Sequence, residues 1–276
     1  MTHAASSGPR RAAVLGRPIA HSLSPVLHRA AYEALGLDWR YDAIDVGAAE
    51  LAGFVAGLGP EWVGLSLTMP LKEAALPLLS TSSELVALTG AANTVLLDSG
   101  RPVGDNTDVP GMVAALAEAG VTRCASAVVL GSGSTARSAL AALAQLGSPH
   151  VTLVSRSEPA AAIAVADRLG LRLDPVSWQP DPLPGAELVI SAVPPGAADG
   201  FASYVGDVGV LLDVVYDPWP TPLAQGCGGV VVPGTALLLH QAAAQVRLMT
   251  GREAPVEAVR EALAAALKGQ ARSAEG

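Results

Sequence analysis

Residues 127–136 read Ala127-Val128-Val129-Leu130-Gly131-Ser132-Gly133-Ser134-Thr135-Ala136, and this stretch decides the fold. Four apolar residues, typical of a short buried strand, run into a turn of small residues, and a segment with helical spacing follows. Small side chains let backbone N–H groups approach a ligand closely, and the N-terminus of the next helix adds positive potential. The pattern is typical of a turn that binds the pyrophosphate of a dinucleotide, with Ala136 at the third small position. An ordinary tight turn is the alternative interpretation.

Further strands are expected around this turn. After a helix at Gly111–Ala119, short β-like runs alternate with helical segments. This alternation predicts a doubly wound, Rossmann-like nucleotide-binding domain. The predicted strands are Ala127–Leu130, Val151–Val154, Leu188–Ser191, Val210–Val214 and Val230–Val232. The proline-rich segment Pro175–Pro184 is predicted to be a surface connection.

The first third of the chain alternates in the same way and predicts an α/β domain with parallel strands and helical crossovers. The alternating segments are Ala12–Leu15, Pro25–Leu35, Trp39–Val46, Leu51–Leu58 and Trp62–Leu67. Asn93–Asp98 and Pro102–Val103 flank Ser99-Gly100, which we expect to be a hairpin turn. Two helices, Thr235–Met249 and Pro255–Leu267, follow the last strand and could pack back on this first domain.

Composition limits the classes of protein that fit. The chain has 276 residues, and 50% of them are hydrophobic. This length exceeds the size at which a single core usually keeps growing, so we expect two domains. A net charge of −8, with no basic cluster beyond Arg10-Arg11, argues against nucleic acid as a partner. Cys124 and Cys227 lie far apart without companion histidines, which predicts reduced thiols and no zinc site. We see no secretory signal and no run of about 20 apolar residues, so we expect a cytoplasmic protein.

The residues after the second strand of the nucleotide-binding domain indicate the cofactor. An NAD-selective protein carries Asp or Glu there to bind the ribose 2′-hydroxyl, but this chain has Ser155-Arg156-Ser157. An arginine at this position favours a 2′-phosphate. We therefore predict NADP(H) as the cofactor. A solvated surface arginine is the alternative.

Lys72 and Asp108 are candidates for proton transfer. Only 15% of the residues are charged, and both of these are embedded in uncharged neighbours. Lys72 follows a predicted strand, so it is expected at a carboxyl end of the sheet, where open α/β folds bind ligands. A nearby carboxylate such as Asp108 would hold the ammonium charged and oriented for proton transfer coupled to hydride transfer. Taken alone, Lys72 would be a surface lysine.

Hydroxyl and amide side chains complete the candidate site. Ser22 and Ser24 lie beside the start of a helix, where hydroxyls suit a carboxylate ligand. Helix capping is the alternative, and it fits Ser24 better than Ser22. Thr68, Asn93 and Asn106 could hydrogen-bond a polyhydroxylated ring, although each alone is also typical of a turn.

These residues fall in ordered segments that can be compared with known families. The segments are Gly16-Arg17-Pro18-Ile19-Ala20-His21-Ser22-Leu23-Ser24-Pro25 with His28, Ser66-Leu67-Thr68-Met69-Pro70-Leu71-Lys72, Gly90-Ala91-Ala92-Asn93-Thr94, Gly104-Asp105-Asn106-Thr107-Asp108, the turn from Gly131, Asp213-Val214-Val215-Tyr216-Asp217-Pro218 with Thr221-Pro222-Leu223, and Gly234 through Gln241 to Thr250-Gly251. In these segments the chain resembles the shikimate dehydrogenase family over nearly its whole length. It departs from the family's common asparagines at Ser66, Ser155 and Ser191.

The resemblance implies NADPH-linked reduction of 3-dehydroshikimate to shikimate, with Lys72 and Asp108 as the catalytic pair. By position, the residues implied in substrate binding are Ser22, Ser24, Thr68, Lys72, Asn93, Asp108, Tyr216 and Gln241. The residues implied in cofactor binding are Glu84, Gly131, Ser132, Gly133, Ser134, Thr135, Ala136, Ser155, Arg156, Val214 and Gly234. No metal is expected. For Glu84, an exposed acid that begins a helix is an equally good interpretation.

The resemblance also implies the domain organisation. Residues 1–108, completed by C-terminal helices at 235–268, would form the substrate-binding and catalytic domain. Residues 109–234 would form the NADP-binding domain, with the active site in the cleft between the domains. The tail at 269–276 is predicted from the sequence itself to be disordered. We expect a monomer or a homodimer that acts on a small molecule. The alternatives are a quinate or aminoshikimate dehydrogenase of the same fold, and a catalytically silent binding paralogue.

Overall fold

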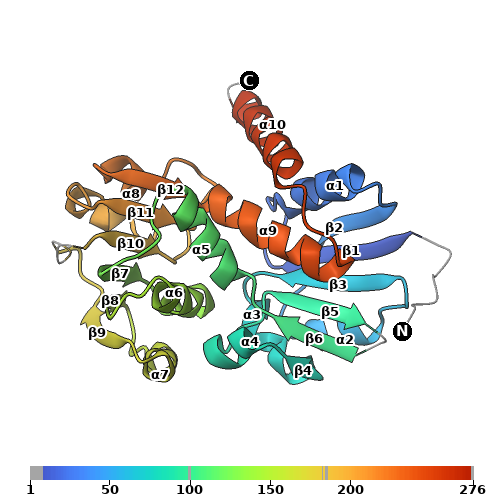
Figure 1. Cartoon of the computed structure of the whole chain (residues 1–276), viewed down its shortest axis with the longest axis horizontal. Coiled ribbons are helices and arrows are strands. Elements are labelled where there is room, and N and C mark those ends of the chain that lie inside the picture. The colour runs from blue at the N-terminus through green and yellow to red at the C-terminus, as the bar shows by residue number, and fades with distance from the viewer. Residues whose placement is uncertain (1–8, 99–100, 182, 184–185, 275–276) are drawn as a thin grey trace. The chain divides into compact units, whose positions relative to one another are not determined.

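A computed structural model of the chain describes residues 9–98, 101–181, 183 and 186–274 (Figure 1). By their internal contacts these residues form two compact units. The first unit runs to Ala87, includes Ala91–Thr107 and resumes at Gln241. The second comprises Leu88–Gly90 and Asp108–His240. The predicted boundary after residue 108 lies next to the observed one, whereas the predicted boundary after residue 234 precedes a helix that the observed boundary crosses.

The first unit is built on a six-stranded sheet in the order β2-β1-β3-β5-β6-β4. The strands are β1 Arg10–Gly16, β2 Trp39–Asp45, β3 Trp62–Leu67, β4 Thr81–Ser82, β5 Thr94–Asp98 and β6 Arg101–Asp105. The helical segments in this part of the chain are α1 Ser24–Ala34, α2 Leu51–Ala56, α3 Leu71–Ala74, η1 Leu76–Leu78 and α4 Glu84–Thr89, and α10 Val256–Ala274 belongs here too.

The strand pairing of this sheet is mixed. β1 pairs in parallel with β2 and with β3, which confirms the predicted crossovers. β5 runs antiparallel to both β3 and β6. The two strands of the predicted hairpin are therefore present. The turn predicted between them at Ser99-Gly100 lies outside the described residues. Because β1 and β3 are parallel, their carboxyl ends lie at the same end of the sheet. The segments that follow these two strands carry Ser22 and Lys72.

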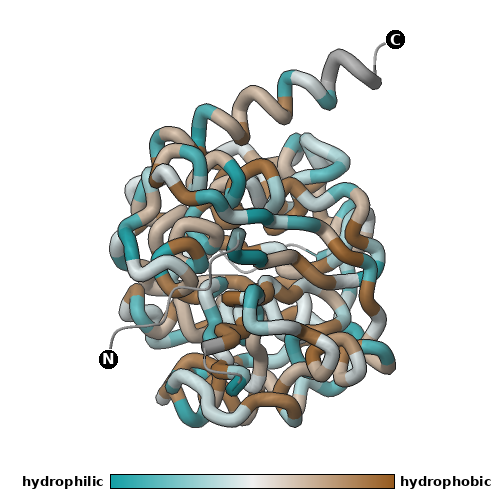
Figure 2. Tube along the Cα trace, turned by 90° about the vertical axis from the view of Figure 1, so that its right-hand side faces the viewer, coloured by the Kyte–Doolittle hydropathy of each residue, from teal (hydrophilic) through white to brown (hydrophobic). Residues whose placement is uncertain are grey.

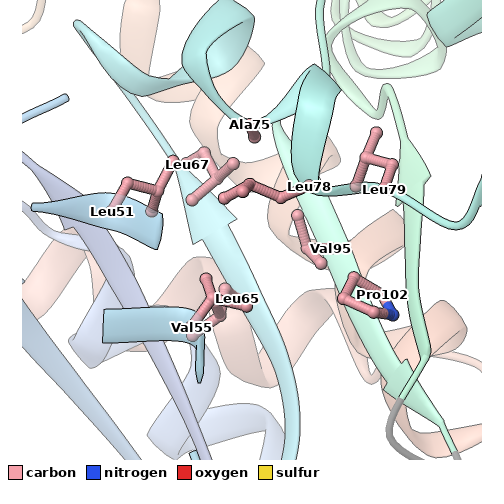
Figure 3. Close-up of a pocket in the computed structure, with 9 residues that line it drawn as sticks. All are labelled: Leu51, Val55, Leu65, Leu67, Ala75, Leu78, Leu79, Val95 and Pro102. Carbon is pink, nitrogen blue, oxygen red and sulfur yellow. The ribbon is translucent and has the colours of Figure 1, made fainter. Parts of the chain in front are cut away.

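One face of this sheet is covered by a leucine-rich core. Its buried members include Leu51, Leu65 and Leu67. Figure 3 shows these side chains with those of Ala75, Val95 and their neighbours around a small space that only apolar residues and a proline line. Because no polar side chain lines it, this space is a packing gap of the core and offers no group for chemistry.

The second unit contains the glycine-rich turn. Its strands are β7 Ser126–Leu130, β8 His150–Ser155, β9 Arg172–Ser177, β10 Leu188–Ser191, β11 Val210–Asp213 and β12 Val230–Pro233. The helical segments are α5 Asp108–Glu118, α6 Ser134–Gln145, α7 Ala160–Leu169, η2 Asp199–Tyr204 and α8 Pro222–Gly226, followed by α9 Gly234–Thr250.

All strands of this second sheet are parallel, in the order β9-β8-β7-β10-β11-β12 (Figure 1). β7 and β10 are buried almost throughout, as expected for strands with helices on both faces. The strand order reverses between β7 and β10, and this point is where open α/β sheets bind ligands. The predicted doubly wound domain is confirmed.

Two local predictions need correction. Pro175 lies inside β9 and not in a surface connection. An edge strand tolerates proline, because the N–H group that proline lacks would have no partner strand on that side. Residues 269–274, predicted to be disordered, continue α10 to Ala274, since alanine, glutamine and arginine there favour the helix. Figure 2 shows α10, the helix that ends near the C label, alternating between hydrophilic and hydrophobic positions, and it packs against α1.

A buried polar network links α1, the sheet and α9 within the first unit. The His28 ring is fully buried and stacks on the Tyr41 ring at 3.9 Å. Its Nε2 lies 3.2 Å from Oε1 of Gln245, and its Nδ1 lies 3.4 Å from the Tyr32 hydroxyl. With Nε2–H as donor to the carboxamide, Nδ1 can accept from the tyrosine, so the neutral ring is satisfied. Burial lowers the pKa of His28 from 6.5 to about 3.

We expect His28 to make folding stability pH-dependent. Its pKa is depressed in the folded state, so this contribution is present above pH 6.5 and is lost as the pH falls toward 3. The loss is ~1.4 kcal/mol per pH unit. His28→Gln should therefore flatten the fall in unfolding free energy between pH 6.5 and pH 4.5, as measured by urea denaturation. His21→Gln, which changes an exposed histidine, is the control. Equal slopes for wild type and His28→Gln would contradict the prediction.

Candidate active site

The loop after β1 presents Ser22 and Ser24 at the start of α1. The Ser22 N–H donates to the Ile19 carbonyl at 3.0 Å, and Oγ of Ser22 accepts from the Ser24 N–H at 3.3 Å. Ser24 itself is the first helical residue and is buried. The capping role considered for Ser24 is not observed, because Leu23 is the N-cap residue and makes no side-chain cap bond; Oγ of Ser22 accepts from the first helical N–H instead. Both hydroxyl residues still lie at the helix N-terminus, as predicted.

The segment after β3 carries Thr68 and Lys72. The Thr68 N–H donates to the Leu15 carbonyl at 2.9 Å, and the Thr68 carbonyl accepts from the Leu71 N–H at 2.8 Å. These bonds fix a turn that leads directly into α3. Lys72 is half-buried there, and its carbonyl accepts from the Ala92 N–H at 2.8 Å. The structure therefore brings Lys72 beside the segment that contains Asn93.

Asn93 is the centre of a buried cluster that also contains Thr94, Thr107 and Gln241. Its Oδ1 accepts from the Thr107 N–H at 2.7 Å and from the Thr94 hydroxyl at 2.9 Å. Its Nδ2 lies 2.9 Å from Oγ1 of Thr107 and 3.2 Å from Oε1 of Gln241. Asn93 is 1% exposed. The cluster thus joins two residues that the sequence assigned to substrate binding.

Asp108 follows this cluster directly in the chain. It is the first residue of α5 and is almost fully buried. Asn106, by contrast, has a structural role: its Nδ2 donates to the Ala91 carbonyl at 3.0 Å, and its N–H donates to the Asp105 carboxylate at 2.7 Å. Asn106 therefore holds the turn that leads to Asp108, in agreement with the alternative reading of it as a turn residue.

Gln245 was not singled out from the sequence. It lies one helical turn after Gln241 in α9 and is buried. Its Nε2 donates to the Asn93 carbonyl at 3.2 Å and to the Thr94 hydroxyl at 3.0 Å, and its Oε1 accepts from the Ser66 hydroxyl at 2.8 Å. The only signal in the sequence was a second glutamine four residues on, within an apolar helix. Gln245 ties the Asn93 cluster to the His28 network.

The glycine-rich turn of the second unit has the geometry that a pyrophosphate site needs. Gly131 has φ +107° and donates its N–H to the Val154 carbonyl at 2.9 Å. A Cβ at this position would lie 2.9 Å from the Ala192 carbonyl oxygen, so only glycine fits. Gly133 precedes α6 and is exposed, with no atom within 4 Å of the position of a Cβ. The turn therefore reaches the N-terminus of α6 with no side chain at Gly133, which is the arrangement predicted for a pyrophosphate site.

Ser155 and Arg156 lie at the carboxyl end of β8, beside this turn. Oγ of Ser155 donates to the Ser157 carbonyl at 2.8 Å, which closes a tight turn around Arg156. Arg156 is exposed. Its place after the second strand of the sheet is the one predicted for a residue that reads the ribose 2′ substituent.

The segment after β11 carries Val214 and Tyr216. Asp213 at its start is buried, accepts from the Thr221 hydroxyl at 2.7 Å and from the Val215 N–H at 3.2 Å, and has its pKa raised by burial. A Cβ at Gly234 would lie 2.2 Å from the Val214 carbonyl oxygen. Asp213 and Gly234 thus hold this segment in place, and Tyr216 projects from it half-buried.

Other predicted features can be located as well. Glu84 is exposed and begins α4, where Oγ of Ser83 accepts from the Val86 N–H at 3.4 Å. Cys124 is buried and Cys227 half-buried, both as free thiols. Among the described residues, no group of three or more His, Cys, Asp or Glu side chains could hold a metal ion. No described helix is both long and apolar enough to cross a membrane.

Comparison with known proteins gives concordant matches. The family described as the shikimate dehydrogenase substrate binding domain matches residues 14–95, and the shikimate 5′-dehydrogenase C-terminal domain matches residues 234–264. Shikimate dehydrogenase (NADP(+)) of Synechocystis sp. is 34% identical, over 91% of this chain and 93% of that protein. The crystal structure of Mycobacterium tuberculosis shikimate dehydrogenase has a TM-score of 0.87 and 45% identity, with coverages of 93% and 100%. Shikimate 5-dehydrogenase of Thermus thermophilus, solved in complex with NADP(H) and shikimate, has a TM-score of 0.80 and 36% identity, with coverages of 93% and 99%.

Gly131→Ala should destabilise the protein by about 2–3 kcal/mol, because the new Cβ meets the Ala192 carbonyl and alanine is strained at φ +107°. Gly133→Ala is the matched control in the same turn, with φ −72° and free space for a Cβ. It should change stability by less than about 0.5 kcal/mol. Urea unfolding of the ligand-free variants measures both effects, and equal stabilities would contradict the strained geometry.

Proposed function

The chain belongs to the shikimate dehydrogenase family, and we propose that Lys72 and Asp108 form its catalytic pair. The protein is an oxidoreductase that acts on a CH–OH group: it reduces 3-dehydroshikimate to shikimate with NADPH, as a step of the shikimate pathway. Its substrate is a small molecule.

One observation carries the assignment of the pair. The Lys72 carbonyl is bonded to the Ala92 N–H, and Asp108 follows Thr107, whose N–H is bonded to Oδ1 of Asn93. The backbone of Lys72 and that of Thr107, the residue before Asp108, are therefore both bonded to the same short segment, residues 92–93. In a chain with only 15% charged residues, this arrangement supports a common role.

The proposed substrate contacts follow from the site described above. Ser22 and Ser24, at the N-terminus of α1, would bind the substrate carboxylate. The residues proposed to hold the ring and its hydroxyls are Thr68, Asn93, Tyr216 and Gln241. Because Oε1 of Gln241 accepts from Asn93, the Nε2 end of this carboxamide is the one oriented away from Asn93. The cluster thereby fixes which end of Gln241 a substrate hydroxyl would meet.

Lys72 and Asp108 would have different parts in the proton transfer. The cofactor supplies the hydride for the carbonyl carbon. As that carbon is reduced, negative charge develops on the carbonyl oxygen, and Nζ of Lys72 would donate a hydrogen bond and then a proton to it. The Asp108 carboxylate would keep the ammonium charged and oriented before this transfer.

The cofactor contacts are proposed along the edge of the second sheet. The pyrophosphate would bind the amides of residues 131–136 at the start of α6. Arg156 would pair with the 2′-phosphate of NADP, because a guanidinium offers several donors to phosphate oxygens. Ser155, Val214 and Gly234 would line the remaining part of the site, and Glu84 is kept as a candidate contact.

The proposal also covers related substrates, the location of the protein and its oligomeric state. Quinate or an aminated shikimate remains a competing substrate, because pocket shape sets selectivity between such rings. A catalytically silent paralogue would not need to retain both Lys72 and Asp108. We expect a cytoplasmic monomer or homodimer without a nucleic-acid partner.

A substrate and cofactor panel tests the function. Shikimate with NADP+ should be oxidised with a kcat/KM about a hundredfold or more above that of quinate with NADP+ or shikimate with NAD+. NADP+ reduction followed by absorbance measures all four combinations of the two substrates and two cofactors. If shikimate does not reduce NADP+ at any pH, the protein does not have the proposed enzymatic activity. If quinate is turned over faster than shikimate, quinate is the substrate.

Lys72→Ala should lower kcat by about 10²–10⁴-fold, with comparatively little change in shikimate binding, because the proton donor is lost while the ring contacts stay. Steady-state kinetics and equilibrium binding of shikimate separate the two effects. Lys268→Ala removes the only other lysine of the chain, from an exposed position in α10, and should leave kcat unchanged. Lost binding with normal kcat in Lys72→Ala would disprove the catalytic role.

A further inference from the structure

Trp178 lies directly after β9 and contacts the head group of Arg156. Cζ of Arg156 is 5.2 Å from the centroid of the Trp178 ring, which is within the range of a cation–π interaction. β8 and β9 are parallel neighbours, and Ser155 is opposite Ser177 in their register. Arg156 and Trp178 therefore leave the sheet side by side, each one residue beyond this pair.

The Trp178 ring is itself held in place. Its backbone N–H donates to the Ser155 carbonyl at 3.0 Å, which ties it to the residue before Arg156. Its ring meets that of Phe201 edge-on, with centroids 5.0 Å apart and an angle of 82°. Phe201 is buried in the core of the second unit, and Trp178 packs against the same core. The Trp178 ring is therefore held in one position, whereas the arginine side chain that it contacts is of a flexible type.

We propose that Trp178 is a positioning residue that increases selectivity for a 2′-phosphorylated dinucleotide by holding the Arg156 guanidinium at the end of β8. This inference rests on the proposed function, in which Arg156 binds the 2′-phosphate. Trp178 needs no contact with the cofactor for this role; it acts through the arginine.

The physical reason is pre-organisation of a flexible cation. An exposed arginine has about 2 kcal/mol of rotamer entropy, much of which is lost when it binds a phosphate. A ring contact restrains the guanidinium beforehand and uses none of its N–H donors, so these donors stay available for phosphate oxygens. A ligand with a 2′-hydroxyl gains little from a restrained guanidinium. The benefit is therefore specific for the 2′-phosphate.

Equilibrium binding without turnover tests the proposal. Isothermal titration calorimetry with NADP+ and with NAD+ gives two Kd values for each variant. Trp178→Leu should raise the Kd for NADP+ about two- to fivefold, the range of an exposed cation–π contact. The Kd for NAD+ should stay unchanged. An equal rise in both Kd values, or none, would overturn the proposal, because a merely structural tryptophan would affect both cofactors alike.

Matched variants complete the test. Trp178→Phe keeps an aromatic ring and should keep the ratio of the two Kd values near that of the wild type. Val176→Ala changes an exposed residue of the same strand and should leave both Kd values unchanged. If Trp178→Leu does not fold, Trp178→Met removes the ring in a second way, and loss of selectivity is expected there too. A Trp178→Phe variant that loses selectivity as fully as Trp178→Leu would count against the ring as the cause.

Arg156→Ala separates this inference from the function on which it rests. This variant should raise the Kd for NADP+ about tenfold or more, as loss of a charge-assisted bond predicts. Adding Trp178→Leu to it should have no further effect on the ratio, because the residue through which Trp178 acts is gone. If Arg156→Ala changes the ratio and Trp178→Leu does not, only the role of Trp178 is wrong. If Arg156→Ala leaves the ratio unchanged, the assignment of Arg156 fails first.

Discussion

The buried carboxamide of Asn93 is the interaction on which the first unit depends. It accepts from the Thr107 N–H and the Thr94 hydroxyl and lies within hydrogen-bond distance of Gln241, so it joins two strands of the sheet to α9. A buried amide is costly unless its donors and acceptors are paired, and here they are. This requirement for pairing fixes the positions of Thr94, Thr107 and Gln241.

The second unit depends on a constraint of a different kind. At the switch point of its parallel sheet, the turn after β7 passes so close to the segment after β10 that no side chain fits at Gly131. The same turn leads into α6 through Gly133, which is exposed and carries no side chain. Close backbone packing on one side and an exposed glycine before the helix on the other are typical of a phosphate site. The chemistry of this unit follows from main-chain geometry more than from side chains.

Sequence patterns predicted most of this architecture, and the errors have physical causes. Apolar runs predicted β7 and β10, because strands buried on both faces must be apolar, and their alternation with helical segments predicted the doubly wound domain. Pro175 suggested a loop, but an edge strand tolerates proline. Ser24 looked like the cap of α1, yet it is the first helical residue, because sequence patterns place helix ends only to within a residue or two. The continuation of α10 to Ala274 was missed, although alanine, glutamine and arginine there favour the helix.

The sequence by itself determined the fold class, the position of the glycine-rich turn, the arginine at the end of β8 and the candidate pair Lys72 and Asp108. These features are local: each depends on residue type and on spacing within one segment. Only the tertiary structure decided that Gln245 holds Asn93 and that Trp178 supports Arg156. Such contacts join residues that are far apart in the chain. A single sequence does not indicate which distant side chains will pack against each other.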